Sequence, residues 1–290
     1  MGEAAGDAAS GGPDRAPGRR PTAAREGTPP PPPPPLGVEV VDSHCHLDLM
    51  DCSVEEAVSA ARAVGVRRLV TIGIDVATSR WSAETAGRYA DVYAGVAIHP
   101  NEAGTADEAA WTEIARLAAL PQVRAVGETG LDYYRDTATP EQQQDSFRRH
   151  IAIAKATDTA LMIHDREAHA DVLRLLAEEG APERTVFHCF SGDAAMARTC
   201  ADSGYYMSFA GNVTFRNANG LREAAATAPL ELLLVETDAP FLTPMPYRGR
   251  PNAPYLVPLT LRALAEVKGA DVDALAAAVA VNSDRVFGPW

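Results

Sequence analysis

The stretch VVDSHCHLDL, residues 40–49, places two histidines directly after a short apolar run that ends at Asp42. Paired valines of this kind favour a buried strand. Because side chains alternate between the two faces of a strand, His44 and His46 share one face, and Cys45 between them lies on the other. Two histidines with this spacing suit either an ordinary strand end or half of a metal site. The residues at the ends of the other strands decide between these two interpretations.

Further short runs of apolar and β-branched residues recur along the chain, and each ends in a polar residue or glycine. Together with the first run they begin at Val38, Val66, Val92, Val123, Ala160, Arg184, Tyr205 and Leu230. Continuous apolar runs of this length indicate strands that are buried on both faces, as in a parallel sheet.

Segments with helical periodicity lie between these runs. Residues 53–65 begin with Ser53 as a helix N-cap and stop at Gly65, and a longer segment opens with Thr139 as the cap and Pro140 at the first helical position. Further helical segments follow each of the last four runs. Eight strands that alternate with helices predict an α/β fold, a closed (β/α)₈ TIM barrel. An open doubly wound sheet is the alternative, but no glycine-rich phosphate loop supports it.

Residues 1–37 differ from the rest of the chain in composition. They are rich in Gly, Ala, Pro, Arg and Glu and include the proline run Pro29–Pro35. Such a segment buries little apolar surface, so we expect a disordered, low-complexity tail with a polyproline II segment. A spacer is the favoured role, and a ligand for an SH3-type domain is the alternative. Residues 38–290 are long enough for one barrel domain.

The formal net charge of −13 falls on the predicted barrel, because the charges of the tail nearly balance. An acidic protein has no general attraction for nucleic acid or anionic membranes, so a phosphate-bearing substrate would need a local binding feature. No long apolar run predicts a membrane span or a secretion signal. The four cysteines lack C-x-x-C spacing, which favours a reduced, cytoplasmic protein.

Residues able to bind metal fall at the carboxyl ends of the predicted strands. They are His44 and His46 after the first run, Glu128 after the fourth, His164 after the fifth, His188 after the sixth and Asp238 after the eighth. Barrel active sites are assembled at this end from several strands. Imidazole and carboxylate ligands without thiolate favour Zn or Mn over Ca, and Mg is also compatible. Four histidines and two carboxylates exceed the needs of one ion, so we expect two divalent ions that share a bridging carboxylate and a water molecule.

The alternation of side chains also bears on the neighbours of these residues. Cys45 and Cys189 are expected to be small buried residues between strand and helix rather than ligands or nucleophiles. Asp42 either orients a histidine from behind or is an ordinary polar residue at a strand end.

The remaining histidines have other expected roles. His99 ends the third strand and either contacts substrate or braces the turn at Pro100. His150 and His169 lie in predicted helices and are expected to be structural.

These segments together resemble the TatD family of metal-dependent hydrolases, which are described as deoxyribonucleases within the amidohydrolase-like barrels. The matching motifs, in order, are DSHCHLD, GETGLDYY, IHDREA, HCFSG, SFAGNVTF, ETDAPFLTP and YRGRPNAP. They extend from about Val38 to Phe287. The chain departs from the family pattern at Ala97 and Asn101, where Gly and His are frequent, and at His150, where Gln is usual.

The resemblance implies a role for each matching residue. It implies that His44, His46 and Asp238 bind the first ion, that His164 and His188 bind the second, and that Glu128 bridges the two. Asp238 would also take a proton from the attacking water, which is a suitable task for a carboxylate in that position.

The favoured function is hydrolysis of DNA phosphodiester bonds, in single strands or at DNA ends, since a barrel mouth does not admit the middle of a duplex. Arg248 and Arg250 could bind phosphate, or they could be solvated in a packed loop. The alternative is hydrolysis of an amide, lactone or aminoacyl ester, because the same pair of ions serves both chemistries. A barrel that only binds a protein partner is disfavoured by the complete ligand set, so no protein partner is predicted.

Overall fold

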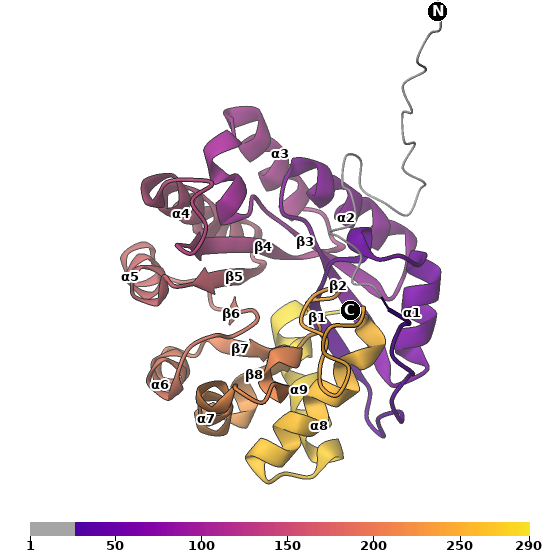
Figure 1. Cartoon of the computed structure of the whole chain (residues 1–290). Coiled ribbons are helices and arrows are strands. Elements are labelled where there is room, and N and C mark those ends of the chain that lie inside the picture. The colour runs from indigo at the N-terminus through magenta and orange to yellow at the C-terminus, as the bar shows by residue number, and fades with distance from the viewer. Residues whose placement is uncertain (1–26) are drawn as a thin grey trace, which may run out of the picture.

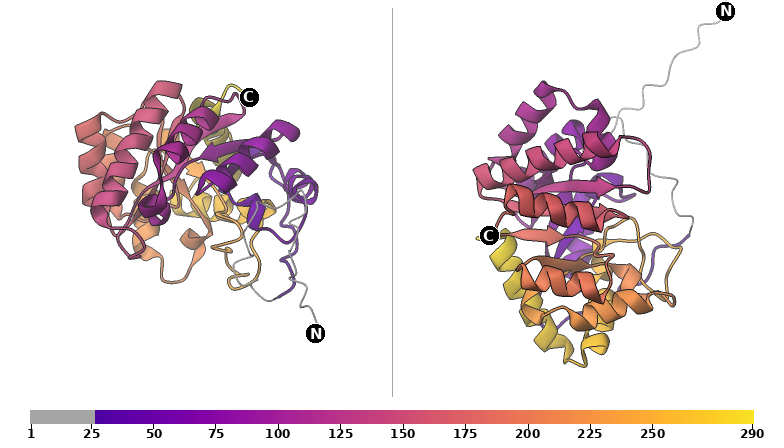
Figure 2. Two further views of the ribbon diagram at one scale, coloured as in Figure 1. Left: turned by 90° about the horizontal axis from the view of Figure 1, so that it is seen from above. Right: turned by 90° about the vertical axis from the view of Figure 1, so that its left-hand side faces the viewer.

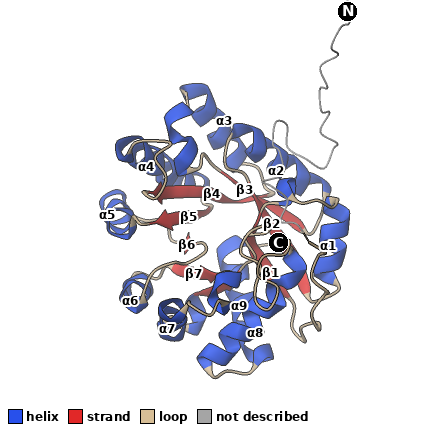
Figure 3. Cartoon of the chain, in the orientation of Figure 1, coloured by secondary structure: helices blue, strands red, loops and turns tan. Residues whose placement is uncertain are grey.

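The computed structural model describes residues 27–290. It contains one sheet of parallel strands that are hydrogen-bonded in sequence order, β1 to β8. The strands are β1 (Val40–Cys45), β2 (Val66–Ile72), β3 (Val92–Val96), β4 (Val123–Asp132), β5 (Ala160–Arg166), β6 (Thr185–Phe187), β7 (Tyr206–Phe209) and β8 (Leu233–Val235). Helices lie outside the strands (Figures 1 and 3). The predicted (β/α)₈ barrel is therefore confirmed.

The barrel closes between β8 and β1 through a few bonds beyond the end of β8 rather than through a regular ladder. The amide of Asp238 donates to the carbonyl of His44 at 2.9 Å, and the amide of His46 donates to the carbonyl of Ala239 at 2.8 Å. Closure therefore places Asp238 beside the two histidines of the first strand.

The α-helices within residues 27–290 follow the strands and cover the outer face of the barrel. They are α1 (Val54–Arg62), α2 (Val76–Arg88), α3 (Glu108–Ala118), α4 (Pro140–Thr157), α5 (His169–Glu179), α6 (Ala194–Asp202), α7 (Asn219–Thr227), α8 (Val257–Lys268) and α9 (Val272–Phe287). Short 3₁₀ turns are η1 (Leu47–Leu49), η2 (Pro100–Thr105), η3 (Gly211–Thr214), η4 (Leu230–Leu232) and η5 (Pro254–Leu256). None of the described helices has the length and apolar character that crossing a membrane requires.

Local capping residues fix where several helices begin. Ser53 forms a reciprocal capping box at α1, and Thr139 forms another at α4, as their positions in the sequence predict. Helices α2 and α3 are additional to those predicted. Each follows an aspartate N-cap, Asp75 or Asp107, whose carboxylate accepts a backbone N–H.

Apolar residues form one layer inside the barrel and a larger layer between strands and helices. Along β5, Ala160 and Met162 belong to the inner layer, whereas Leu161 and Ile163 belong to the outer one. This alternation directs His164, the next inward position, toward the open carboxyl end. The two further views in Figure 2 show the helices packed around the strands.

Residues 28–36, which we call the proline strap, lie against the barrel. This differs from the expected disordered tail, whose first part, residues 1–26, lies outside the described residues. Pro30 and Pro33 are buried, with the three-residue spacing of a polyproline II helix. The strap carbonyls accept hydrogen bonds from Arg250 (to Thr28 and Pro29), Tyr255 (to Pro30) and Arg262 (to Pro34 and Pro35).

Candidate metal centre

All six residues expected to bind metal meet at the carboxyl end of the barrel. His44 lies in β1 and His46 directly follows it, Glu128 lies in β4, His164 in β5, His188 one residue beyond β6 and Asp238 three residues beyond β8. Glu128 does not end its strand, because β4 continues to Asp132. A cavity of about 520 Å³ opens above the group and is lined by His46, Glu128, His164 and Asp238 among others.

The pairing of β4 with β5 positions Glu128 beside His164. Gly130 lies opposite His164 in the register, with φ of +124°. A Cβ atom at Gly130 would come within 2.1 Å of the His164 carbonyl oxygen, so glycine is required for this close approach. The approach brings Glu128 Oε1 to 2.7 Å from His164 Nδ1.

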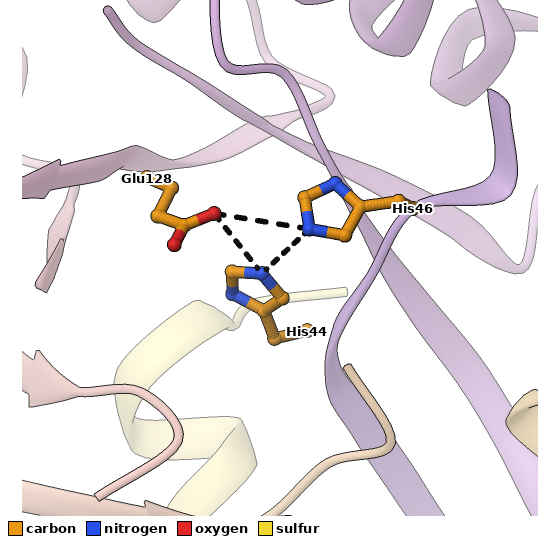
Figure 4. A group of neighbouring side chains, drawn as sticks. All are labelled: His44, His46 and Glu128. Atoms are coloured by element: carbon orange, nitrogen blue, oxygen red, sulfur yellow. Dashed lines mark hydrogen bonds and ion pairs between the residues drawn. The ribbon is translucent and has the colours of Figure 1, made fainter. Parts of the chain in front are cut away.

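The other oxygen of Glu128 faces the two histidines at the end of β1. Its Oε2 lies 3.6 Å from His44 Nε2 and 3.7 Å from His46 Nε2, and these nitrogens are 3.3 Å apart (Figure 4). Asp238 Oδ1 lies 3.7 Å and 3.6 Å from the same nitrogens. A tetrahedral ion with ligand distances of about 2.1 Å would have ligand–ligand edges of about 3.4 Å. His44, His46 and Glu128 are therefore close enough together to hold one divalent ion, and Asp238 lies beside the two histidines.

Glu128 Oε1 serves a separate pair of histidines. It lies 2.7 Å from His164 Nδ1 and 2.9 Å from His188 Nε2. One carboxylate thus places its two oxygens against two sets of imidazole nitrogens, which is the arrangement that a carboxylate shared by two ions requires.

The outer nitrogens of two rings are held by acceptors, which fixes the ring orientation. His46 Nδ1 lies 3.2 Å from the carbonyl oxygen of Ile72, and His188 Nδ1 lies 3.2 Å from Glu236 Oε1. Both partners accept hydrogen bonds, so each Nδ1 donates and the neutral ring keeps its Nε2 lone pair for the centre.

Burial and close charges together set the protonation of the centre. Burial raises the pKa of Glu128, but His188 and His99 outweigh it and hold that pKa well below its usual range. Burial lowers the pKa of His188, but Glu128 and Glu236 outweigh it and raise that pKa well above its usual value. Burial and the neighbouring His188 keep the pKa of His44 well below its usual value. A cation bound here would replace a proton as the partner of Glu128.

His99 both braces a turn and lines the cavity, so its two expected roles are compatible. Its Nδ1 accepts the amide proton of Asn101 at 3.0 Å, which leaves the hydrogen of the neutral ring on Nε2. Nε2 lies 3.4 Å from Glu128 Oε1. His99, Glu128 and His164 are close enough to hold an ion. With hydrogen on Nε2, however, His99 is better suited to donate to an oxygen in the cavity. Burial lowers its pKa, which favours the neutral ring.

The two arginines expected to bind phosphate have other partners. The guanidinium of Arg248 lies 4.2 Å from the centre of the Phe215 ring, and Arg250 donates to carbonyls of the proline strap. Among the described residues, neither belongs to the lining of the cavity.

The two cysteines beside candidate ligands differ from each other. Cys45 is fully buried, and its thiol donates to the carbonyl of Val70 at 3.5 Å, as expected for a small core residue. Cys189 is partly exposed and has φ of +42°. The expected burial of Cys189 between strand and helix is therefore wrong, because β6 ends at Phe187 and strand alternation does not extend to Cys189.

Asp42 orients backbone rather than an imidazole ring. Its carboxylate accepts from the amide of Thr237 at 2.9 Å and from the amide of His44 at 3.3 Å. It thereby joins β1 to the segment that carries Asp238. Burial raises the pKa of Asp42 to about 8.

The two helical histidines have structural contacts, as expected. His150 Nε2 accepts the amide proton of Ile98 at 3.0 Å, and His169 Nδ1 lies 2.7 Å from Asp165 Oδ2.

Two acids near the centre are absent from the expected site. Glu236 is fully buried behind His188, and Asp132 Oδ2 lies 3.3 Å from His164 Nε2. The sequence contains a signal for each. Glu236 precedes Asp238 by two residues in ETDAP, and Asp132 ends the GETGLD motif at the true end of β4.

Comparison with known proteins gives one consistent family. The model of the family described as TatD related DNase matches residues 41–288. A Mycobacterium tuberculosis H37Rv protein, named an uncharacterized metal-dependent hydrolase TatD, is 46% identical over 258 residues, covering 86% of this chain and 98% of that protein. YcfH of Escherichia coli K12, named an uncharacterized metal-dependent hydrolase, is 38% identical over 255 residues, covering 86% and 95%.

Solved structures match over the same part of the chain. The crystal structure of YjjV, a TatD homologue from Escherichia coli K12, has a TM-score of 0.81 and 28% identity, covering 86% of this chain and 98% of that chain. A TatD family hydrolase from Entamoeba histolytica has a TM-score of 0.79 at 18% identity, covering 88% and 100%. The second match shows the fold alone.

Proposed function

The chain belongs to the TatD family of metal-dependent hydrolases, and we propose that it hydrolyses DNA phosphodiester bonds at two divalent ions, Zn²⁺, Mn²⁺ or Mg²⁺. The observation that carries the proposal is the position of Glu128, whose two oxygens face separate groups of histidines. A carboxylate in this position suits two ions that share one water molecule. The family description supports DNA as the substrate.

The donors divide into two sets around Glu128. In the proposal, the first ion is held by His44, His46, Glu128 and Asp238, and the second by Glu128, His164 and His188. Imidazole nitrogen and carboxylate oxygen suit Zn²⁺ and Mn²⁺, and carboxylate also suits Mg²⁺. Such ions, when bound, would polarise a phosphoryl group and lower the pKa of a bound water molecule.

Two side chains that line the cavity accept or donate a hydrogen in this reaction. Asp238, whose side chain is 15% exposed, accepts a proton from the water that attacks phosphorus. His99 donates its Nε2–H to a phosphate oxygen and so orients the group under attack. A new P–O bond forms with the water oxygen and the bond to the leaving oxygen breaks. The leaving oxygen gains the proton that Asp238 took from the water.

The cavity favours single strands or DNA ends over duplex interiors. Its volume of about 520 Å³ lies within the range of pockets that hold a molecule the size of a nucleotide. The centre lies at the end of the barrel, where an unpaired end can enter. Hydrolysis of an amide, lactone or ester would use the same residues, so the choice between the substrates requires an assay.

The test measures metal content and cleavage on the same full-length protein. End-labelled single-stranded DNA should be degraded with at least one of Mg²⁺, Mn²⁺ and Zn²⁺, and mass spectrometry should find two ions per chain. Glu128→Gln and Asp238→Asn should each lower kcat by roughly 100-fold or more. The exposed Glu231→Gln is the matched control. If no ion supports DNA cleavage and the protein turns over an amide or lactone, the nuclease proposal is wrong and the alternative hydrolase function is favoured.

A further inference from the structure

Two arginines beside the metal centre have no ion-pair partner among the described residues. Arg135 and Arg166 both line the cavity, on the side formed by β4 and β5. The chain carries a net charge of −13, so carboxylates are abundant on it. Arginines that line a cavity and remain unpaired in such a protein are available to an anionic ligand.

Arg166 is held in place by an aromatic ring. It ends β5, two residues beyond His164, so both side chains belong to the same face of the strand. Its guanidinium carbon lies 3.8 Å from the centre of the Tyr134 ring, which itself is 60% exposed. Stacking on the ring fixes the guanidinium plane and leaves its N–H edges free for phosphate oxygens.

Asp132 connects the turn that carries Tyr134 and Arg135 to the metal centre. Its Oδ1 accepts the amide protons of Tyr134 and Arg135 at 3.0 and 3.1 Å, and so fixes the turn that carries both residues. Its Oδ2 lies 3.3 Å from His164 Nε2. One carboxylate therefore sets the position of Tyr134 and Arg135 relative to a candidate metal ligand, and Arg166 stacks on Tyr134.

We propose that Arg135 and Arg166 form a phosphate subsite, which binds the phosphate adjacent to the one cleaved in a single-stranded nucleic acid, with Tyr134 as a positioning residue. Two residues along a strand span about 6.6 Å, so Arg166 lies one step away from His164 rather than at the reacting phosphoryl group. In a single-stranded nucleic acid, the phosphate next to the one cleaved carries the negative charge that an arginine binds, and it lies at a comparable distance from the reacting phosphate. This inference rests on the proposed nuclease function.

The test compares substrates with and without neighbouring phosphates. Steady-state rates would be measured on the metal-loaded full-length protein with hexathymidylate and with bis(4-nitrophenyl) phosphate, which has a single phosphodiester group. Arg166→Gln should lower the ratio of the two kcat/KM values, oligonucleotide over small diester, roughly tenfold or more, chiefly through KM for the oligonucleotide. Arg135→Gln, an exposed change that is easily tolerated, should act in the same direction.

Two further measurements separate a phosphate contact from a general effect. Each lost contact should reduce the slope of log kcat/KM against log salt concentration by about 0.7. Tyr134→Phe keeps the stack and should behave as the wild type, whereas Tyr134→Ala should resemble Arg166→Gln. Arg67→Gln, which removes one positive charge at the amino end of β2, is the matched control and should leave the ratio unchanged.

The outcomes distinguish the two proposals. If the wild type cleaves hexathymidylate but Arg166→Gln and Arg135→Gln retain its substrate ratio and salt slope, the subsite is wrong and the nuclease stands. If the wild type cleaves neither phosphodiester with any ion, both proposals are overturned.

Discussion

His188 Nδ1 lies 3.2 Å from Glu236 Oε1, on the side of the ring that faces away from Glu128. Glu236 is fully buried, and the same oxygen accepts the amide proton of Cys189 at 2.8 Å. A buried carboxylate behind a histidine fixes the ring and makes its other nitrogen a better metal ligand. Glu236 is therefore a positioning residue for His188, which holds the second ion in the proposed function.

Glu236→Gln should weaken binding of the more loosely held ion by about 10- to 100-fold. The amide keeps the shape of the side chain but loses the negative charge that polarises the ring of His188. Isothermal titration of the metal-free protein with Zn²⁺ or Mn²⁺ would measure the change without reference to catalysis. The exposed Glu231→Gln should bind metal with the affinity of the wild type. If Glu236→Gln also kept that affinity, Glu236 would not position His188 for metal binding.

Gly130→Ala should disturb both folding and the centre. The new Cβ would meet the His164 carbonyl at 2.1 Å, and φ of +124° disfavours any side chain. We expect a loss of roughly 2 kcal/mol or more in the free energy of unfolding, with weaker metal binding because Glu128 and His164 move apart.

Gly220→Ala is a matched control for that change. Gly220 lies in α7, and a Cβ there would meet no atom within 4 Å. Alanine should leave stability unchanged or raise it by up to about 1 kcal/mol. Urea unfolding of the two variants checks both expectations, and equal stability would show that the β4–β5 contact relaxes easily.

The sequence predicts most of the barrel because each strand is a short apolar run that ends in a polar residue or glycine. It also predicts which histidines and carboxylates meet, because parallel strands bring their carboxyl ends together. Helix α2, with the sequence VATSRWSAETAGR, has few large apolar residues and so shows little amphipathic pattern. Cys189 is misplaced because the expected end of β6, His188, is one residue beyond the observed end at Phe187, so the alternation of the strand does not extend to Cys189.

Contacts between distant parts of the chain account for the other differences. Arg250 contacts Thr28, which is 222 residues away, so no local pattern could assign this partner. Glu236 and Asp238 both follow β8 within one motif. Only closure of the barrel onto β1 shows that Asp238 faces His44 and His46, whereas Glu236 contacts His188.

Stability should fall in acid through His150. Burial lowers its pKa to about 3, so the folded protein keeps this ring neutral where the unfolded chain protonates it. The unfolded state then binds the extra proton below its pKa of about 6.5, and stability falls as pH decreases toward 3. From pH 7 to pH 5, protonation of this group in the unfolded chain should lower the free energy of unfolding by about 2 kcal/mol.

His150→Gln isolates that contribution. An amide oxygen can still accept the Ile98 amide proton, but it does not titrate in this range. Urea unfolding at the two pH values should show a smaller loss for the variant, by about 2 kcal/mol. Equal losses in both proteins would mean that His150 is protonated in the folded state or that other groups dominate.

Removal of the proline strap should destabilise the barrel. A chain that begins at Gly37 loses the buried Pro30 and Pro33 and the acceptors of Arg250 and Tyr255. We expect a loss of about 1–3 kcal/mol, which corresponds to a fall in Tm of roughly 2–10 °C. A chain that begins at Gly27 keeps every strap contact and is the control for truncation itself.

Tyr255→Phe tests whether the strap acts through its observed contacts. The change removes the hydroxyl that donates to the Pro30 carbonyl at 2.6 Å. In the chain that begins at Gly27, the change should lower the free energy of unfolding by about 0.5–1.5 kcal/mol. In the chain that begins at Gly37 it should leave the free energy of unfolding almost unchanged, because the Pro30 carbonyl is absent. A double-mutant cycle by urea unfolding gives the coupling directly. Equal effects in both chains would show that Tyr255 stabilises the barrel without the strap.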